Sequence, residues 1–474
     1  MGVGITSYGV YIPRYRLERK KIQEAIGWAS PYFIPGEKAV ANYDEDSVTM
    51  AHAASLLCTE GKKEVEVLYF ASTTNPLGEG EAASIIMTAL GLEPSVRTAD
   101  FSNSLKAGTS ALLSAFDAVK AGAKGALVCA ADMRLGKPGS LLEMLFGDGG
   151  AAFRIGQEGV VAELKGHFSL SCDFPDYRRL WDDQFVKAAE ERFIREEGYG
   201  KLIVQAIEGI LKKYGLKAKD FAKVGYPCLN LGEYYRIAKQ LGFESEQIQE
   251  PLLTQIGETG CASPLMILAW MLENAKVGEN VLIVSYGNGS EALWFEVKEG
   301  IESHRGKVKR MFERSRPLLN YNKYLAFRKL LPIELELLGD IPSSQPPLLW
   351  RERKAILGLW GSKCKRCGTP QYPPQRICVN PECNAIDEME EYWFANRPAR
   401  LFTFTVDNSA ETLNPPMIYG FVDFEEGGRF VFEITDCEVE EVRIGMPLRM
   451  SLRRKYEDRQ RGFVGYFWKA IPAF

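Results

Sequence analysis

The fold of this 474-residue chain is decided by the stretch TADFSNSLKAGT, residues 98–109. An apolar helical pattern follows over residues 107–119, and its first three residues, Ala107, Gly108 and Thr109, are small. Small side chains let a helix N-terminus approach a ligand closely, and the free amides and dipole there favour negative charge. Leu105 stands just before this N-terminus, and its side chain can neither ionise nor act as a nucleophile.

Residues 1–301 alternate short runs of β-branched residues with longer helical patterns, which is typical of a layered α/β domain. Continuous apolar runs at residues 65–70 and 126–130 predict buried parallel strands. A helix is predicted over residues 46–57, because the acidic residues 44–46 suit the positive end of its dipole.

This first domain also repeats itself. The apolar run 126–129 leads to a glycine-rich bend and a second run, 147–153. The same order recurs in the run 281–284 and the bend and run of residues 287–293. Each half is therefore predicted to end in a strand, a glycine-rich bend and another strand, as in a duplicated layered domain.

Composition and charge restrict the class of protein. The chain is 46% hydrophobic and 25% charged, as is usual for a globular domain, and its net charge of −4 gives no reason to expect nucleic acid or an anionic membrane as the main partner. We expect no signal peptide, since no basic segment followed by an apolar block opens the sequence, and no apolar run reaches the roughly 18 residues of a membrane span. Ten cysteines without an export signal indicate a reducing compartment, so a cytoplasmic location is expected.

Four of the ten cysteines cluster, while the other six are scattered singly. Cys364 and Cys367 form a Cys-x-x-Cys-Gly knuckle, and Cys378 and Cys383 supply a second pair. Four thiolates close a tetrahedral shell and leave no position for water, so the spacing predicts a structural Zn²⁺ site. Residues 351–390 are therefore predicted to form a zinc ribbon.

Residues 391–474 contain several short segments with alternating polar and apolar residues. Segments 400–406, 417–422 and 430–434 each carry this period of two, and Gly427-Gly428 predicts a hairpin turn. Short strands at this spacing are typical of a small β-barrel.

The order of ribbon, barrel and the closing segment 462–467 resembles the zinc-ribbon/OB-fold proteins that accompany thiolases and hydroxymethylglutaryl-CoA synthases in archaea and bacteria. This resemblance implies a rubredoxin-like ribbon and an OB-type barrel, which in those systems usually form a separate small subunit. OB folds also bind single-stranded nucleic acid through aromatic residues and a basic groove. Acidic residues interleave with the aromatic ones here, which disfavours that alternative: Glu425, Glu426, Glu438, Glu440 and Glu441.

The first 300 residues resemble the hydroxymethylglutaryl-CoA synthases, a branch of the thiolase superfamily. The resemblance rests on Lys-Ala-Gly-Thr at 106–109, on SYGVYIPRYR at 7–16, on the acidic helix start at 44–47 and on the strand end at 284–287. It implies a thiolase-like duplicated αβαβα domain for residues 1–301.

Condensation in that family needs an attacking cysteine, a carboxylate base, a histidine that orients the acyl carbonyl and an asparagine near the oxyanion. The positions that match these residues hold, in that order, Leu105, Thr73, Pro227 and Glu258. The three histidines, His52, His167 and His304, lie outside the segment where the family places its catalytic histidine. The resemblance therefore implies a synthase-like domain with no catalytic residue of its own.

A relocated nucleophile is the alternative. Ser104 is next to the usual position, and Cys228 and Cys261 lie in segments that line the family's pocket, although buried structural thiols are the simpler interpretation. Glu258 would act as a base if burial raised its pKa, or it would pair with a lysine such as Lys106.

Residues 302–350 are predicted to be a basic and proline-containing linker. Residues 304–310 form a basic run, and residues 341–347 favour neither helix nor strand. The basic run could bind the phosphates of CoA or an acidic partner surface, or it could be a solvated helical connector.

The preferred hypothesis is a non-nucleophilic, scaffolding subunit of an acyl-CoA thiolase or acyltransferase complex that makes or cleaves β-ketoacyl-CoA C–C bonds. Its expected partner is a catalytic thiolase subunit, around a homodimeric core within a hetero-oligomer, with CoA or acyl-CoA as a ligand. Two alternatives remain: a stand-alone synthase-like acyltransferase with a relocated nucleophile, and a protein that binds acyl-CoA or single-stranded nucleic acid without catalysis.

Overall fold

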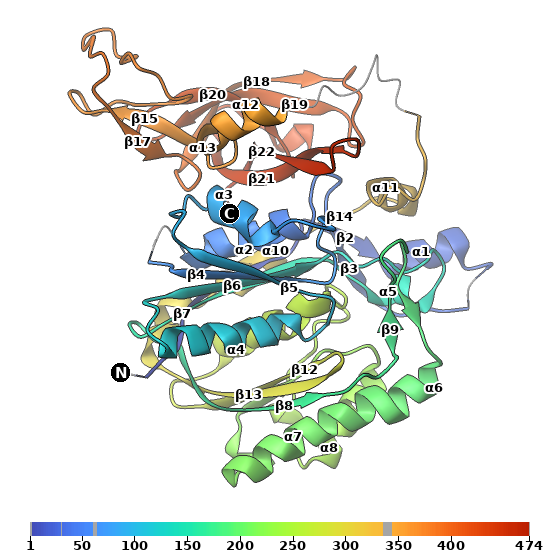
Figure 1. Ribbon diagram of the computed structural model, residues 1–474. Coiled ribbons are helices and arrows are strands. Elements are labelled where there is room, and N and C mark those ends of the chain that lie inside the picture. The colour runs from blue at the N-terminus through green and yellow to red at the C-terminus, as the bar shows by residue number, and fades with distance from the viewer. Residues whose placement is uncertain (1, 30, 60–63, 335–343, 474) are drawn as a thin grey trace.

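Two helices, α4 (Ala107–Lys120) and α9 (Ser263–Asn274), lie between the two halves of a nine-stranded sheet. The computed structural model describes residues 2–29, 31–59, 64–334 and 344–473. Helices α2 (Ser47–Thr59) and α3 (Ala82–Ala89) cover one half of the sheet, and α7 (Gly200–Tyr214) and α8 (Leu231–Gln240) cover the other (Figure 1). The predicted thiolase-like αβαβα layering is confirmed.

The sheet has the strand order β11-β12-β13-β8-β1-β7-β6-β4-β5. Its two halves are joined where Gly4 and Ile5 pair with Glu163 and Ala162. The strands are β1 (Gly4–Tyr11), β4 (Val67–Ser72), β5 (Arg97–Ser102), β6 (Ala126–Asp132), β7 (Gly149–Gly156), β8 (Ala162–Ser171), β11 (Lys223–Gly225), β12 (Asn280–Tyr286) and β13 (Gly289–Val297).

The internal repeat that the sequence predicts is present in these strands. Strand β6 pairs antiparallel with β7, and β12 pairs antiparallel with β13. Strand β4 runs parallel to β6 and is buried along its whole length, as its continuous apolar run predicts. Helix α4 buries one face against both half-sheets, and Gly108 on that face lets the carbonyl oxygen of Cys261 come close, because a Cβ there would clash with it.

The segment predicted to be a linker is largely folded against the synthase-like layers. Helix α10 (Lys307–Glu313) packs on β1 and α9, and β14 (Arg316–Pro317) pairs with β2 (Tyr15–Glu18), beside β3 (Glu37–Val40). Helix α11 (Tyr321–Phe327) follows. Its aromatic side chains are buried in one cluster with residues of β2, and this packing holds the helix on the domain. Residues 335–343 of the predicted linker lie outside the described residues, and α12 (Pro346–Arg351) and α13 (Arg353–Ile356) lead into the ribbon.

The zinc ribbon and the barrel have the predicted architecture. The ribbon pairs β15 (Trp360–Cys364) with β16 (Pro370–Gln371) and β17 (Met389–Trp393). The barrel closes in the order β18-β19-β20-β22-β21. Its strands are β18 (Ala399–Asp407), β19 (Met417–Phe424), β20 (Arg429–Ile434), β21 (Pro447–Asp458) and β22 (Phe463–Pro472). Gly427 and Gly428 both have positive φ, as the turn between β19 and β20 requires.

The remaining elements are short apart from α1. They are α1 (Arg19–Ile26), α5 (Leu141–Leu145), α6 (Glu191–Phe193), β9 (Tyr177–Arg178), β10 (Lys187–Ala188) and the helical turns η1 (Ile194–Tyr199), η2 (Ala218–Asp220), η3 (Ser245–Gln247), η4 (Gly260–Ala262), η5 (Glu299–His304) and η6 (Val439–Glu441). Within the described ranges, we find no helix whose length and apolar character would allow it to cross a bilayer.

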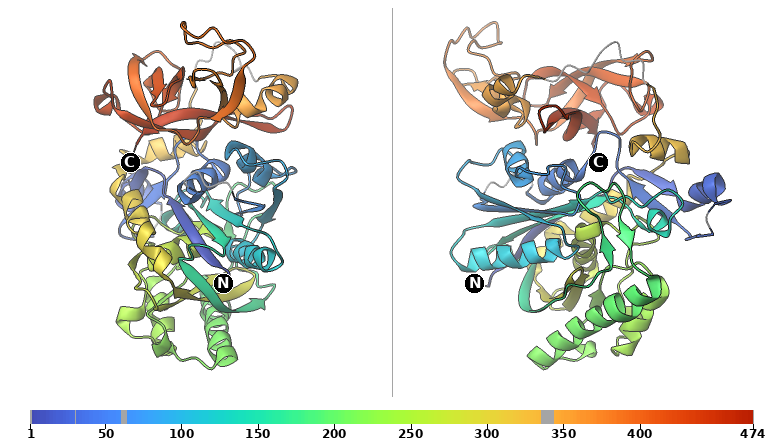
Figure 2. Two further views of the ribbon diagram at one scale, coloured as in Figure 1. Left: turned by 90° about the vertical axis from the view of Figure 1, so that its left-hand side faces the viewer. Right: turned by 45° about the vertical axis from the view of Figure 1, so that its right-hand side comes forward.

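The barrel lies against the outer helices of the synthase-like domain (Figures 1 and 2). A buried charged seam joins the two parts. Arg453 of β21 lies 3.1 Å from Asp44, 3.1 Å from Glu45 and 2.6 Å from Asp436, and all four side chains are almost fully buried. Burial disfavours the charge of Arg453, but these carboxylates hold its pKa well above the ordinary value. Lys469 adds a second cation 2.9 Å from Asp44.

Replacing Arg453 with methionine, which keeps the volume, is expected to destabilise the protein by about 3–5 kcal/mol, because it leaves buried carboxylates without their main partner. Calorimetric unfolding of the full chain measures this loss. The matched control is Arg429→Met, whose ion pair with Asp423 is exposed on the barrel and is expected to contribute less than about 1 kcal/mol. Equal unfolding temperatures for the two variants would contradict this account of the seam.

Candidate functional site

Leu105 lies in the short connection between β5 and α4, and its backbone is pressed against Gly287. A Cβ on Gly287, whose φ is +153°, would lie 2.7 Å from the Cβ of Leu105, so only glycine fits there. The hydroxyl of Ser104 donates a hydrogen bond to the carbonyl of Gly287 over 3.0 Å. Ser104, the weak alternative nucleophile, therefore uses its hydroxyl to fix this connection.

Thr73, at the position of the expected base, is held by Asp132. Asp132 ends β6, is fully buried and accepts hydrogen bonds from the backbone amide and the hydroxyl of Thr73, over 2.7 and 2.9 Å. It also accepts from the hydroxyl groups of Ser72 and Thr74 and from the amides of Thr74 and Cys261, each over 2.8–3.0 Å. We call Asp132 and these four partners the Asp132 hub.

Glu258, at the position of the expected asparagine, forms a buried ion pair. Its Oε2 lies 2.7 Å from a guanidinium nitrogen of Arg134, and both side chains are 4% exposed. The guanidinium also lies over the ring of Phe146, 4.1 Å from the ring centroid. Burial raises the pKa of Glu258, while Arg134 lowers it. The suggested pairing of Glu258 with Lys106 is not observed, because Lys106 lies 3.9 Å from Glu291 instead.

The two candidate cysteines are buried. Cys261 is fully buried in η4, and burial together with Asp132 raises the pKa of its thiol well above the ordinary value. Burial raises the pKa of Cys228 to about 12. The carbonyl of Pro227, beside Cys228, accepts a hydrogen bond from Tyr199 over 2.7 Å. Neither thiol has the depressed pKa of a reactive cysteine.

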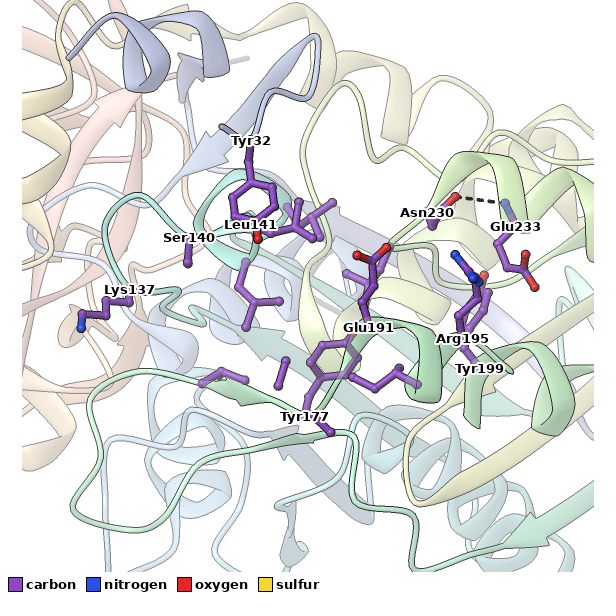
Figure 3. A pocket seen from close by; sticks show the side chains of 17 residues that line it. Tyr32, Lys137, Ser140, Leu141, Tyr177, Glu191, Arg195, Tyr199, Asn230 and Glu233 are labelled. Carbon is purple, nitrogen blue, oxygen red and sulfur yellow. Dashed lines mark hydrogen bonds between the residues drawn. The ribbon is translucent and has the colours of Figure 1, made fainter. Parts of the chain in front are cut away.

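A cavity of about 380 Å³ is lined in part by Tyr199, the hydrogen-bond partner of Pro227 (Figure 3). Its walls come from residues 137–145, 186–199 and 229–233, with Tyr32 and Tyr177 completing the lining. The lining is mainly apolar, and its charged residues are two basic ones, Lys137 and Arg195, and two acidic ones, Glu191 and Glu233. Burial, and then the charge of Asp176, raise the pKa of Tyr177. Arg134 lowers this pKa and Glu258 raises it, so the Tyr177 side of the cavity lies near the buried ion pair.

The structure joins some of the predicted positions and separates others. Thr73 and Cys261 share Asp132, and the first turn of α4, next to Leu105, packs on Cys261 through Gly108. Glu258 is tied to Arg134, and Pro227 is bound by Tyr199, which lines the cavity. Each predicted position thus has a local structural partner.

Sequence reasoning missed Asp132 and Arg134. Both come shortly after the buried run 126–130. The carboxyl end of a strand in an α/β sheet commonly faces a ligand site. A charged pair at that place is the signal that could have identified them.

The predicted metal ligands come together in the ribbon. The Sγ atoms of Cys364, Cys367, Cys378 and Cys383 all lie within 4.8 Å of one another. Zn–S bonds of about 2.3 Å in a tetrahedron require sulfur atoms about 3.8 Å apart. Cys364 and Cys383 are 3.8 Å apart, and Cys367 and Cys378 are 3.5 Å apart, so the residues fit zinc. Hydrogen bonds from Thr369 lower the pKa of Cys367 to about 6, which favours the thiolate that binds metal.

Two family models match the C-terminal part of the chain. Residues 351–390 match the rubredoxin-like zinc ribbon domain of ChsH2, and residues 394–453 match its C-terminal OB-fold domain. The ribbon and barrel predicted from the sequence are confirmed by these matches.

Curated relatives match the N-terminal part. A hydroxymethylglutaryl-CoA synthase of Caldivirga maquilingensis is 34% identical over 349 residues, which cover 70% of this chain and 99% of the relative. One from Methanopyrus kandleri is 33% identical over 344 residues, covering 69% of this chain and 98% of the relative.

Solved structures show the same fold. A hydroxymethylglutaryl-CoA synthase complexed with CoA has a TM-score of 0.64 at 19% identity, covering 73% of this chain and 95% of that one. The 3-oxoacyl-[acyl-carrier-protein] synthase III of Aquifex aeolicus has a TM-score of 0.53 at 18% identity, covering 62% of this chain and all of that one.

Replacing Cys378 with serine, or treating the chain with a strong chelator, is expected to remove the metal and unfold the ribbon, since such sites contribute most of the folding energy of small metal domains. Metal analysis should give one zinc per native chain and much less for the variant. The ring centroids of Trp360 and Trp393, on the ribbon strands, lie 6.5 Å apart, so tryptophan fluorescence can report the unfolding of the ribbon. Cys437→Ser, outside the cluster, is the control, and full zinc content in Cys378→Ser would refute the site.

Proposed function

The chain belongs to the hydroxymethylglutaryl-CoA synthase family, and from this premise we propose that it is a non-nucleophilic subunit of an acyl-CoA thiolase or acyltransferase complex. Its fold is of the acyltransferase type that acts on C–C bonds of acyl-CoA, extended by a zinc ribbon and an OB barrel of the ChsH2 kind. The proposed role is to organise a catalytic thiolase that makes or cleaves β-ketoacyl-CoA bonds.

The Asp132 hub is the observation that carries this proposal. A condensing enzyme needs a base free to take a proton from the substrate. At the corresponding position, the amide and hydroxyl of Thr73 are both bound to Asp132, and a threonine hydroxyl has no useful basicity. Asp132 itself accepts hydrogen bonds at both carboxylate oxygens, so the carboxylate holds neighbouring segments together and is not free to take a proton from a substrate.

The remaining groups support the same assignment. Attack on a thioester needs a thiolate, but burial holds the thiols of Cys228 and Cys261 in the protonated form. Glu258 is committed to Arg134 in a buried pair. The nucleophile and base are therefore proposed to come from the partner thiolase.

We propose the zinc ribbon as the docking surface for that thiolase. Ile377, Val379 and Ile386 are 58%, 58% and 61% exposed at the ribbon. Apolar side chains gathered at an exposed position are typical of protein interfaces. For the homodimeric core we propose the free edge of the sheet, since β5 is its last strand and its residues are only half-buried.

We propose that the cavity in Figure 3 accepts part of an acyl-CoA. Its volume of about 380 Å³ lies in the range of small-molecule sites, and its apolar walls suit an acyl or pantetheine chain. Two basic residues, Lys137 and Arg195, and two acidic residues, Glu191 and Glu233, line the cavity, so its apolar walls are the feature that supports this ligand. The ligand would then be bound without being attacked.

Incubation of the isolated chain with acetyl-CoA is expected to leave its mass unchanged, because no described thiol near the site is a ready nucleophile. The Leu105→Cys variant is expected to gain one acetyl group, since a thiolate at the start of α4 is favoured by the helix amides. Intact-protein mass spectrometry measures both, and the double variant Leu105→Cys with Cys261→Ser is the control. Acetylation of the native chain at Cys228, Cys261 or Ser104 would instead support a relocated nucleophile.

A thiolase with intact cysteines, encoded beside this gene, is expected to copurify with the full chain and to need it for full activity. The double variant Ile377→Lys and Ile386→Lys is expected to lose the partner while keeping its zinc, because both side chains are exposed. Trp28→Lys, 89% exposed on the synthase-like domain, is the control. Full thiolytic activity of the isolated chain would refute the proposal.

A further inference from the structure

A cavity of about 320 Å³, which we call the barrel pocket, lies where α13 and the ribbon meet the barrel (Figure 1). Residues 430–433 of β20 and 467–469 of β22 line it, and the ribbon contributes Tyr372. Within the described ranges, one backbone pair, Ile434 with Ala470, joins β20 to β22. The residues before this pair are not held together by ladder hydrogen bonds, which leaves room for the pocket. Among the described residues, none lines both this pocket and the cavity of Figure 3.

The walls of the barrel pocket are largely aromatic. Tyr372 and Phe432 have ring centroids 6.3 Å apart and ring planes at 27°, and Phe430 meets these two rings edge-on at 5.1 and 5.5 Å. Phe467 and Trp468 of β22 complete the aromatic lining. The hydroxyl of Tyr372 and the indole N–H of Trp468 donate hydrogen bonds to backbone carbonyls, each over 2.9 Å, so these two rings offer carbon surface to a ligand.

One lysine of the barrel pocket differs from the other charged residues that line it. Arg453 is held by the carboxylates of the seam, and Glu433 is paired with Lys469. Lys455 is exposed, its Nζ lies 4.8 Å from the centroid of the Phe467 ring, and among the described residues no carboxylate is paired with it. The pocket therefore combines an aromatic interior with one ammonium group at its exposed side.

We propose that the barrel pocket binds a small, planar aromatic carboxylate. A cavity of roughly 150 Å³ accepts benzene, so the volume of the barrel pocket accommodates about two fused rings. The rings pack on the aromatic walls in the offset or edge-on arrangements that aromatic pairs prefer. The carboxylate faces Lys455, where it remains partly hydrated and its charge is compensated. A hollow with one available cation favours a small ligand over single-stranded nucleic acid, which needs a basic groove along its backbone.

The test is isothermal titration calorimetry of the full chain with β-naphthoate and, separately, with the neutral β-naphthalenemethanol. The native chain is expected to bind naphthoate saturably and the alcohol about ten-fold more weakly, because only the carboxylate pairs with Lys455. Lys455→Met is expected to weaken naphthoate binding about ten-fold and to change alcohol binding less than about two-fold, since it removes the charge and keeps the length of the side chain. Phe430→Ala, at a partly exposed position, is expected to weaken the binding of both probes about five-fold, because it removes one wall.

Lys213→Met is the matched control. Lys213 is also exposed, with its Nζ 5.2 Å from the centroid of the Tyr214 ring, but it belongs to α7 and does not line the pocket. Its substitution is expected to change either affinity less than about two-fold.

Three results would overturn the proposal. Naphthoate does not bind saturably, Lys213→Met weakens its binding as much as Lys455→Met does, or both pocket variants bind it like the native chain, which would place the probe elsewhere. Tighter binding of a thymidine oligonucleotide than of naphthoate, lost in Phe430→Ala, would overturn it in favour of single-stranded nucleic acid.

Discussion

A buried charged seam centred on Arg453 holds the barrel on the synthase-like domain. The two acidic residues that Arg453 meets on that domain, Asp44 and Glu45, directly precede α2, and the third, Asp436, belongs to the barrel itself. Such a cluster tolerates little displacement, because a buried carboxylate that loses its cationic partner is left as an uncompensated charge. The barrel is therefore fixed relative to the sheet.

Buried carboxylates have a second structural use at the site. Asp132 holds the ends of β4 and β6 to η4, and Glu258 holds Arg134 over Phe146. Asp132 lies beside Thr73, at the position of the expected base, and Glu258 stands at the position of the expected asparagine. Amides, hydroxyls and a guanidinium neutralise these two charges, so the polar groups make this part of the structure rigid.

Much of the fold could be predicted from the sequence because its signals are local. The apolar run 126–130, the helix after Gly108 and the cysteine spacing each depend on a few neighbouring residues, and so does the OB-type alternation. The contacts of the site could not be predicted, because they join distant segments. Thr73 and Asp132 are 59 residues apart, and Arg134 and Glu258 are 124 apart. The linker prediction rests on charge and proline content. It therefore overlooks the aromatic residues of α11, which are buried in the structure.

The close packing around Asp132 limits which side chains position 73 accepts. A glutamate at position 73 would bring a second carboxylate beside a fully buried first one and would remove the hydrogen bond that the Thr73 hydroxyl donates to it. Two like charges in such surroundings repel strongly. A glutamate at position 73 would therefore require position 132 and its neighbours to change with it.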